Sequence, residues 1–191
     1  MRKKWRKMRR GLAVLGVVLV VAFGYLGFLR LSGNFHEVSP GAVYRAAQMD
    51  GQALVRWHRD HGIASVLNLR GENDGADWYE TEKAVTDRLG IQHINFRMSA
   101  SKQLTPAEAK QLIEVMRDAP KPLLIHCMGG ADRTGLASAL YVAGIDGGSE
   151  SAAEWQLSAL YGHISLPGIS RAWAMDQTWE RIEPHLGFFD S

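Results

Sequence analysis

The stretch that decides the fold is HCMGGADRTG, residues 126–135, which holds the only cysteine of the 191-residue chain. It joins an apolar stretch that predicts a buried strand, 122–126, to one that predicts a helix, 133–145. A turn of this length can wrap around a phosphate, with backbone N–H groups pointing inward and the helix N-terminus aimed at the same point. The predicted phosphate-binding residues are Met128, Gly129, Gly130, Ala131, Asp132 and Arg133.

Four residues of this turn suit a bound phosphate. Fixed partial positive charge around Cys127 favours the thiolate form of its side chain. Arg133 offers a planar fork for two phosphate oxygens, which a lysine cannot match. Gly130 allows the backbone to turn tightly against the ligand. We expect the Thr134 hydroxyl to hydrogen-bond the sulfur and to help a leaving group depart.

Written as H-C-x-x-G-x-x-R-T-G, the stretch resembles the signature of the cysteine-dependent protein tyrosine and dual-specificity phosphatases, in their atypical bacterial branch. The resemblance implies a covalent phosphocysteine intermediate on Cys127, which water later hydrolyses. We expect His126 to orient and hydrogen-bond near the thiolate rather than to act as a base. A lone buried cysteine would not explain Arg133. Rhodanese-like sulfurtransferases share a cysteine loop, but Gly130 and the 133–135 run favour the phosphatase.

The order of the predicted elements indicates an α/β fold. Strands that alternate with helices predict a parallel-rich central sheet flanked by helices, with the cysteine loop at a strand's carboxyl end. The segments 43–46, 66–72 and 162–163 extend the resemblance over about residues 40–165. We expect strands at 43–45 (a short edge strand), 63–69, 91–96 and 122–126, and helices at 53–61, 77–89, 105–117, 133–145, 149–160 and 169–182.

The N-terminus predicts a transmembrane signal anchor. Residues 1–10 carry seven of the 22 basic residues, and the uncharged apolar stretch 11–29 follows. Nineteen helical residues span about 28 Å, close to the hydrocarbon thickness of a bilayer. A cleaved signal peptide, with residues 22–24 as the weak cleavage site, and a buried helix of the folded domain are the alternatives. The positive-inside rule then places residues 1–10 in the cytoplasm and the rest outside it, in the periplasm if the source is a bacterium.

The remainder predicts one catalytic domain, residues 41–191, after a linker and entry turn over residues 31–40. Without residues 1–30 the chain keeps 14 basic against 20 acidic residues, a net charge of −6, so the basic balance belongs to the anchor. We therefore expect no nucleic-acid partner. A single cysteine excludes a disulfide within the chain, which leaves Cys127 without an internal partner that could inactivate it.

The general acid is the part of the mechanism that the sequence leaves open. Phosphate-ester cleavage by this route needs a proton donor, which in the family follows the strand at 91–96, but residues 97–103 contain no carboxylate. Asp132, where the myotubularin lipid phosphatases also carry an aspartate, is our first candidate; its alternative role is a structural carboxylate that bonds loop amides or Arg133. The other candidates are Glu72, Asp74 and Asp77, which could equally form a solvated acidic turn with a helix N-cap.

No histidine shows metal-ligand spacing with acidic residues or with Cys127, so we expect no metal, and no cofactor is implied. The leading function is a membrane-anchored hydrolase of phosphotyrosine proteins, with phosphoserine or phosphothreonine as further substrates. The alternatives are a phosphatase of phosphoinositides or small phosphoesters and a phosphate-binding module without turnover.

Overall fold

The computed structural model describes residues 2–189, without the side chains of residues 2–4 and 6–9. It divides into two compact units, Met1–Ser32 and Gly33–Ser191. The first unit holds one long helix, α1 (Arg2–Leu31). Within the described residues, one helical stretch, Arg10–Leu31, is long and apolar enough to cross a bilayer, and a signal sequence would meet the same criterion.

The second unit is built on a central sheet of five strands, of which the alternating pattern predicted four. Its strands are β1 (His36–Ser39), β2 (Val43–Ala46), β3 (Ser65–Asn68), β4 (Gln92–Asn95) and β5 (Leu123–His126). Their order in space is β1-β2-β5-β3-β4, and only the β1–β2 pair is antiparallel. The chain therefore has an α/β fold with a mostly parallel sheet. Strand β5, which ends at the cysteine loop, lies at its centre.

The first strand corrects two expectations. Residues 36–39 were expected to be part of a linker, but they pair with β2 as an antiparallel hairpin with His36 opposite Arg45. Strand β2 is consequently an inner strand and not an edge strand, and all four of its residues are buried. The physical reason is the tight turn at 40–42, where the Ala42 N–H donates to Ser39 O and returns the chain beside itself.

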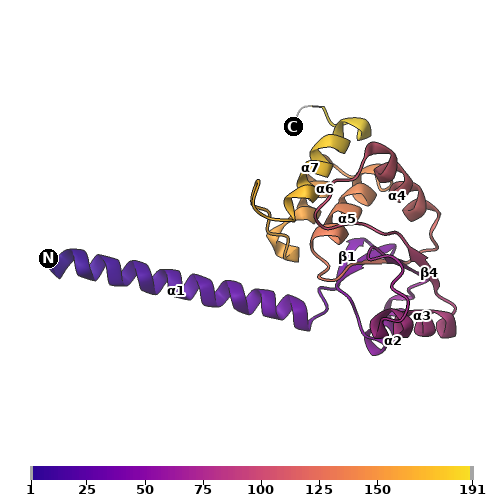
Figure 1. Ribbon diagram of the computed structural model, residues 1–191, viewed down its shortest axis with the longest axis horizontal. Helices are drawn as coiled ribbons and strands as arrows, with labels where there is room; N and C mark the ends of the chain where they lie inside the picture. Colours follow the sequence, from indigo (N-terminus) through magenta and orange to yellow (C-terminus); the bar gives the residue numbers. More distant parts are fainter. Residues whose placement is uncertain (1, 190–191) are drawn as a thin grey trace. The chain divides into compact units, whose positions relative to one another are not determined.

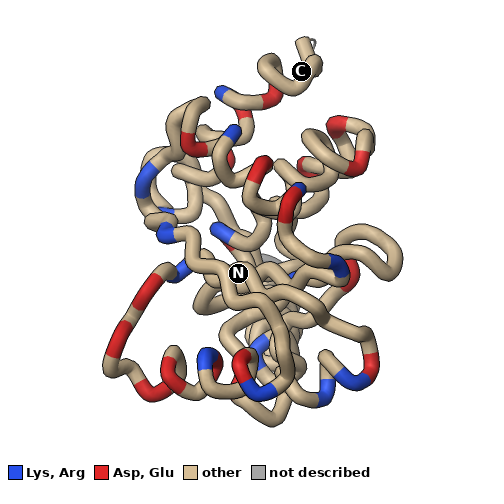
Figure 2. The backbone as a smooth tube through the Cα atoms, turned by 90° about the vertical axis from the view of Figure 1, so that its right-hand side faces the viewer, with Lys and Arg blue, Asp and Glu red and all other residues tan. Residues whose placement is uncertain are grey.

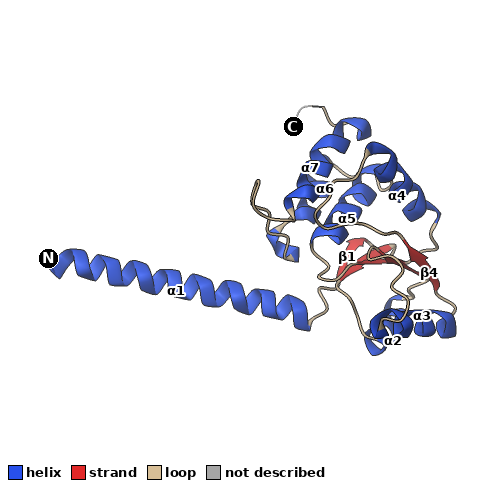
Figure 3. Ribbon diagram, viewed as in Figure 1, coloured by secondary structure: helices blue, strands red, loops and turns tan. Residues whose placement is uncertain are grey.

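Helices cover both faces of the sheet (Figure 3). Helices α2 (Gly51–His61) and α3 (Asp77–Leu89) pack on one face, where side chains such as Leu54 and Val66 form a small core. Helices α4 (Pro106–Asp118), α5 (Asp132–Gly144) and α7 (Trp173–Ile182) pack on the other, around a larger core. Acidic and basic residues are interleaved along the backbone (Figure 2).

Local sequence signals set several helix ends. Asp50 caps α2, since its carboxylate accepts from the Ala53 N–H at 2.7 Å, and Gly62 ends that helix in the left-handed conformation. Thr105 and Glu108 form the predicted capping box at the start of α4. These ends agree with the sequence because each depends on residues only three or four positions apart.

The C-terminal region differs from the predicted helices at 149–160 and 169–182. The first is a short helix, α6 (Glu150–Glu154), followed by two 3₁₀ turns, η1 (Trp155–Leu157) and η2 (Ala159–Tyr161). Ser158 between the two turns is extended, and the carbonyl of Gln156 accepts from Arg45. Helix α7 begins only at residue 173 and is followed by a final turn, η3 (Glu183–Leu186).

Candidate active site

The cysteine loop leaves the central strand and enters α5. Cys127 follows β5 directly and is buried, with 3% of its surface exposed. Helix α5 starts at Asp132, so its N-terminus points at the loop. The predicted arrangement of strand, loop and helix is therefore present around the only cysteine. We call residues 127–133 the phosphate loop.

Arg45 on β2 supports residues 130 and 131 of the phosphate loop. It is fully buried, and its Nη2 donates to the carbonyls of Gly130 at 3.0 Å and Ala131 at 3.3 Å. Its Nη1 donates to both the carbonyl and the side-chain oxygen of Gln156 at 2.8 Å, and its guanidinium lies 3.9 Å from the centre of the Tyr161 ring. Burial lowers the pKa of Arg45 to about 10, so the group still carries its charge at neutral pH.

Two further residues support residues 128 and 129 of the phosphate loop. The backbone N–H of Gln48 donates to the carbonyl of Met128 at 3.2 Å, and the buried Asn34 side chain donates to the carbonyl of Gly129 at 3.1 Å. All four carbonyls from residue 128 to residue 131 therefore accept from groups around the loop. Because a peptide unit is planar and trans, the N–H that follows each carbonyl points the opposite way, toward the centre of the loop. Those are the N–H groups of residues 129–132, which can bind an anion there.

Gly130 has a packing role within the protein that the sequence did not reveal. Its φ is +68°, and a Cβ there would lie 2.6 Å from the carbonyl carbon of Ala46 and from the amide nitrogen of Ala47. The backbone of Gly130 therefore packs tightly against the end of β2. Gly135 is similarly confined, because a Cβ there would lie 2.8 Å from Gln156 O. Both glycines let α5 and the loop pack against the residues that support them.

Arg133 lies across the strand ends beside the loop. Its Nη1 donates to the carbonyls of Met98 at 3.3 Å and Leu69 at 3.4 Å. Its Nε is buried and has no hydrogen-bond partner among residues 2–189. A guanidinium anchored by one nitrogen, with another donor unused, is suited to receive a phosphate oxygen.

Thr134 departs from its expected contact. Its hydroxyl is buried, but within the described part of the chain it makes no hydrogen bond, including none to the sulfur of Cys127. A buried hydroxyl without a partner is costly, so this group is a donor available to the thiolate or to a ligand.

His126 is bonded to the buried carboxylate of Glu82. Its Nε2 lies 3.1 Å from Oε1 of Glu82, which also accepts from His93 Nε2 at 2.8 Å. The other oxygen of Glu82 accepts from the Gln48 side chain at 3.1 Å. Burial alone would raise the pKa of Glu82, but the two histidines outweigh it and lower this pKa to about 2. The orienting role expected for His126 thus has a fixed partner on α3.

Asp132 contacts a buried histidine that the sequence did not reveal. Its Oδ1 lies 2.8 Å from Nδ1 of His163, whose Nε2 lies 3.1 Å from Asp176 on α7. Burial alone would lower the pKa of His163, but these two carboxylates raise it to about 9. About a third of the Asp132 side chain is exposed, so this carboxylate also faces the solvent at the loop.

The alternative acids lie on an exposed loop and at the first residue of α3. Glu72, Asp74 and Asp77 are all exposed, and the backbone carbonyl of Glu72 accepts from Arg97. The N-cap of α3 is Ala76, without a side-chain cap bond, and not one of these acids. The solvated acidic turn is present, but the expected acidic N-cap is not.

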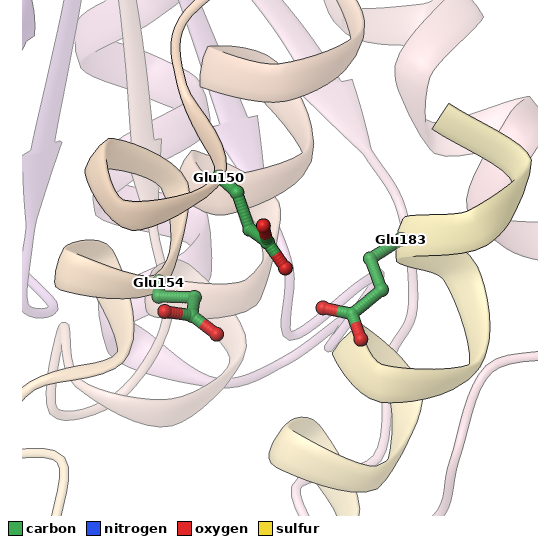
Figure 4. A group of neighbouring side chains, drawn as sticks. All are labelled: Glu150, Glu154 and Glu183. Atoms are coloured by element: carbon green, nitrogen blue, oxygen red, sulfur yellow. The ribbon is translucent and has the colours of Figure 1, made fainter. Parts of the chain in front are cut away.

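Three other carboxylates come together outside the phosphate loop. Figure 4 shows Glu150 and Glu154 of α6 facing Glu183 of η3, with one oxygen from each within 4.8 Å of the others. We expected no metal because histidine spacing gave no sign of one, and these acids lie too far apart in sequence to be recognised together. An acidic cluster alone does not define a metal site, and we assign none.

The comparison with known families then identifies the chain's relatives. The profile of the tyrosine phosphatase family matches residues 26–163, which includes the phosphate loop. The chain belongs to the tyrosine phosphatase family. A cysteine-based phosphatase family accounts for the buried cysteine, the phosphate loop and the arginine that follows it. A comparison with curated proteins finds no match.

Solved phosphatase structures share the fold. TpbA from P. aeruginosa is 20% identical with a TM-score of 0.60, over 82% of this chain and 92% of that one. A cysteine-to-serine variant of TpbA in complex with pTyr is 19% identical with a TM-score of 0.56, over 77% and 91%. The core catalytic domain of a PP-IP phosphatase from S. cerevisiae, in complex with citrate, is 19% identical with a TM-score of 0.59, over 80% and 91%.

Sequence reasoning missed the residues that support the loop: Asn34, Arg45, Gln48, Glu82 and His163. One signal could have revealed Arg45, since a charged residue inside an apolar strand needs a buried partner. The sequence around the other four gives no such signal, and only the folded chain brings them to the loop.

Proposed function

We propose that this phosphatase is a membrane-anchored, cysteine-dependent enzyme that hydrolyses phosphotyrosine in proteins, with phosphoserine or phosphothreonine as further substrates. The observation that carries the proposal is the set of four outward loop carbonyls beside Cys127, because it leaves four N–H groups for the three oxygens of a phosphate. The acidic balance of the domain and the buried thiol fit an enzyme that uses its loop, and not surface charge, to recognise a phosphate.

The proposed reaction has two steps. The Cys127 thiolate attacks phosphorus, an S–P bond forms and the P–O bond to the leaving group breaks, while Asp132 gives that oxygen its proton. Water then attacks the phosphocysteine, the S–P bond breaks, and Asp132 takes the proton from the water. Arg133 and the loop N–H groups stabilise the charge on the equatorial oxygens in both steps. Thr134 stabilises the sulfur as it leaves.

The proposed anchor is α1. Its apolar stretch is uncharged from residue 11 to residue 29 and is preceded by a basic segment, which favours an uncleaved signal anchor with its N-terminus in the cytoplasm. The catalytic domain then lies outside the cytoplasm. A reporter that works only after export, fused after residue 191, should be active; an active cytoplasmic reporter would reverse the orientation, and a mature N-terminus near Tyr25 would show cleavage.

The test of the reaction uses the full chain in detergent with para-nitrophenyl phosphate. Turnover by the parent chain and none by Cys127→Ser, with inorganic phosphate still bound by the variant, would support the covalent route. Turnover by Cys127→Ser would overturn it. Phosphate binding without turnover by the parent chain would identify a binding module instead.

A second candidate is a phosphatase of lipid or small-molecule phosphoesters. Asp132 in the loop and the anchor favour it, whereas the absence of lysine between Cys127 and Arg133 disfavours highly charged inositol phosphates. A panel of phosphopeptides and phospholipids, assayed on the same preparation, distinguishes the two substrate classes.

A further inference from the structure

A segment next to the phosphate loop exposes large apolar side chains. Ile164, Leu166 and Ile169 expose 54%, 52% and 83% of their surfaces, and they belong to the loop between η2 and α7 (Figure 1, orange). Residues 155–170 contain no Asp, Glu, Lys or Arg. We call residues 164–169 the apolar segment. Grouped exposed apolar side chains without charges are unusual on a monomer and indicate a contact surface.

The apolar segment is attached at its start and closed by a local turn at its end. His163, which precedes it, is bonded to Asp132 of the phosphate loop and to Asp176 of α7. At its other end the N–H of Ser170 donates to Leu166 O at 3.0 Å, and the Ser170 hydroxyl accepts from the Leu166 N–H at 2.9 Å. The start of the segment is therefore attached to the phosphate loop and its remainder forms a local turn, while Ile164, Leu166 and Ile169 remain exposed.

One buried side chain connects three parts of the chain. Nδ2 of Asn34 donates to Gly129 O in the phosphate loop at 3.1 Å and to Tyr161 O, just before the apolar segment, at 2.9 Å. Asn34 is 2% exposed, and its backbone φ of 47° lies in the left-handed region that few residues other than glycine adopt. The start of the domain, the phosphate loop and the base of the apolar segment thus meet at this residue.

The end of α1 lies close to this meeting point by chain length alone. Helix α1 ends at Leu31, three residues before Asn34. Three residues span at most about 11 Å. If α1 crosses a bilayer, as the proposed function holds, Asn34 cannot be farther than that from the end of the membrane-spanning helix. The headgroup region on each side of the hydrocarbon core is itself about 5 to 7 Å thick.

We propose that Ile164, Leu166 and Ile169 insert into the interfacial layer of the bilayer that holds α1. This contact holds the phosphate loop at the membrane surface, and it favours phosphomonoesters displayed there over those free in solution. The inference rests on the anchor in the proposed function. The short connection between α1 and Asn34 keeps the domain near the bilayer. It gives no comparable argument for a soluble partner or for a second copy of the chain. Exposed Trp155 at the edge of the same uncharged stretch suits the headgroup level.

The first test measures where the segment lies. Since Cys127 is the only cysteine, Ile169→Cys in a Cys127→Ser chain gives one thiol for a fluorophore, and Lys110→Cys on the exposed face of α4 gives the matched control. Both are placed in phosphatidylcholine nanodiscs with brominated acyl chains. We expect lipid bromine to quench the label at position 169 and not at position 110. Equal quenching at both positions, or a label at position 169 that iodide reaches freely, would overturn the proposal. Protection from iodide without quenching by bromine would show a protein partner instead, which also overturns it.

The second test measures the effect on turnover. The substrate is one phosphotyrosine peptide, used free or joined to an acyl chain in vesicles that carry the full-length protein. We expect the Leu166→Asp/Ile169→Asp pair to lose about tenfold, or 1.4 kcal/mol, on the tethered peptide and less than about twofold on the free one. Phe189→Asp, at another exposed apolar side chain, should change neither. Equal effects on both peptides would contradict membrane docking.

The two tests separate failure of this inference from failure of the proposed function. A chain that does not enter nanodiscs has no membrane anchor, and then both the anchor and the docking fail. A chain that enters nanodiscs but does not cleave the free peptide fails only the proposed reaction. A chain that enters nanodiscs and cleaves the free peptide, but with an unquenched label at position 169, fails only the docking.

Discussion

Asp132 in the phosphate loop and His163 before the apolar segment are joined by a 2.8 Å contact between Oδ1 and Nδ1. His163 is buried, and its other nitrogen lies 3.1 Å from Asp176 on α7. The first residue of α5 is therefore tied to the C-terminal helix through one imidazole. This contact stabilises the domain and orients a carboxylate of the phosphate loop at the same time.

Replacing His163 with glutamine should destabilise the domain in a pH-dependent way. The pKa of His163 is raised from 6.5 to about 9, so its contribution is complete below about pH 6.5 and is lost as the pH rises through about 9. The difference in unfolding free energy between parent and His163→Gln should be at most about 3 kcal/mol at pH 6 and should nearly vanish at pH 10. Urea unfolding at pH 6, 8 and 10 measures it, with the exposed His185→Gln as control. A difference independent of pH would show that the ion pairs are not its cause.

Replacing Arg45 should weaken phosphate binding as well as stability. Arg45→Met leaves buried carbonyls of Gly130, Ala131 and Gln156 without this donor, and we expect a loss of about 3 kcal/mol or more in unfolding free energy. Arg45→Lys keeps the charge but not the fork, so it should lose less stability. Its inhibition by inorganic phosphate should still weaken by about tenfold, because the loop N–H groups lose their alignment. Arg59→Lys at the surface is the control, and an unchanged phosphate inhibition constant in Arg45→Lys would contradict the positioning role.

Glu82 should contribute to stability near neutral pH and lose that contribution in acid. Its pKa is lowered from 4.5 to about 2, so the contribution is present above about pH 4.5 and is lost as the pH falls toward 2. Glu82→Gln cannot accept hydrogen bonds at both side-chain ends and should be less stable than the parent at pH 7 by at most about 3 kcal/mol. The gap should narrow below pH 4.5 and be nearly closed at pH 2 in urea titrations, whereas the exposed Asp87→Asn should show no such gap at pH 7.

The sequence predicted what depends on neighbouring residues. The phosphate loop, its strand and its helix lie within about 25 consecutive positions, and glycine, arginine and cysteine each have one role in such a turn. The same holds for the capping box at Thr105 and the helix end at Gly62. Alternating elements were enough to predict a mostly parallel sheet, because a parallel strand needs a crossover helix.

The supports of the loop were not predictable, since their partners are distant in sequence. Arg45 reaches Gly130 across 85 positions, and Asn34 reaches Gly129 across 95. The position of Arg45 in an apolar strand indicates that it needs a buried partner but not which one, and no local pattern distinguishes Asn34 from an ordinary surface residue. The contact beside the break at Ser158 is equally distant, because Gln156 bonds Arg45 across 111 positions.

Arg133→Lys should reduce turnover by orders of magnitude although the charge is kept. The Nη1 of Arg133 is held by the carbonyls of Leu69 and Met98, and its buried Nε has no partner among residues 2–189. A lysine cannot both satisfy those carbonyls and present a second donor to phosphate. The ratio kcat/KM for para-nitrophenyl phosphate measures the effect. A loss below about tenfold, or 1.4 kcal/mol, would show that Arg133 does not hold the phosphate.

The general acid can be identified by how each carboxylate responds to the leaving group. If Asp132 donates the proton, Asp132→Asn should strongly slow cleavage of phosphotyrosine, whose leaving group needs protonation, and should affect activated aryl phosphates much less. The lost contact to His163 would instead slow both substrates alike, so the dependence on the leaving group separates chemistry from structure. Asp74→Asn, on the exposed loop, and Asp77→Asn, at the adjoining start of α3, should leave both rates nearly unchanged. A loss that depends on the leaving group at Asp74 or Asp77, with a uniform and mild effect at Asp132, would move the acid to that loop. If no carboxylate shows the dependence, water or the substrate supplies the proton, and turnover of phosphotyrosine should be slow in the parent chain itself.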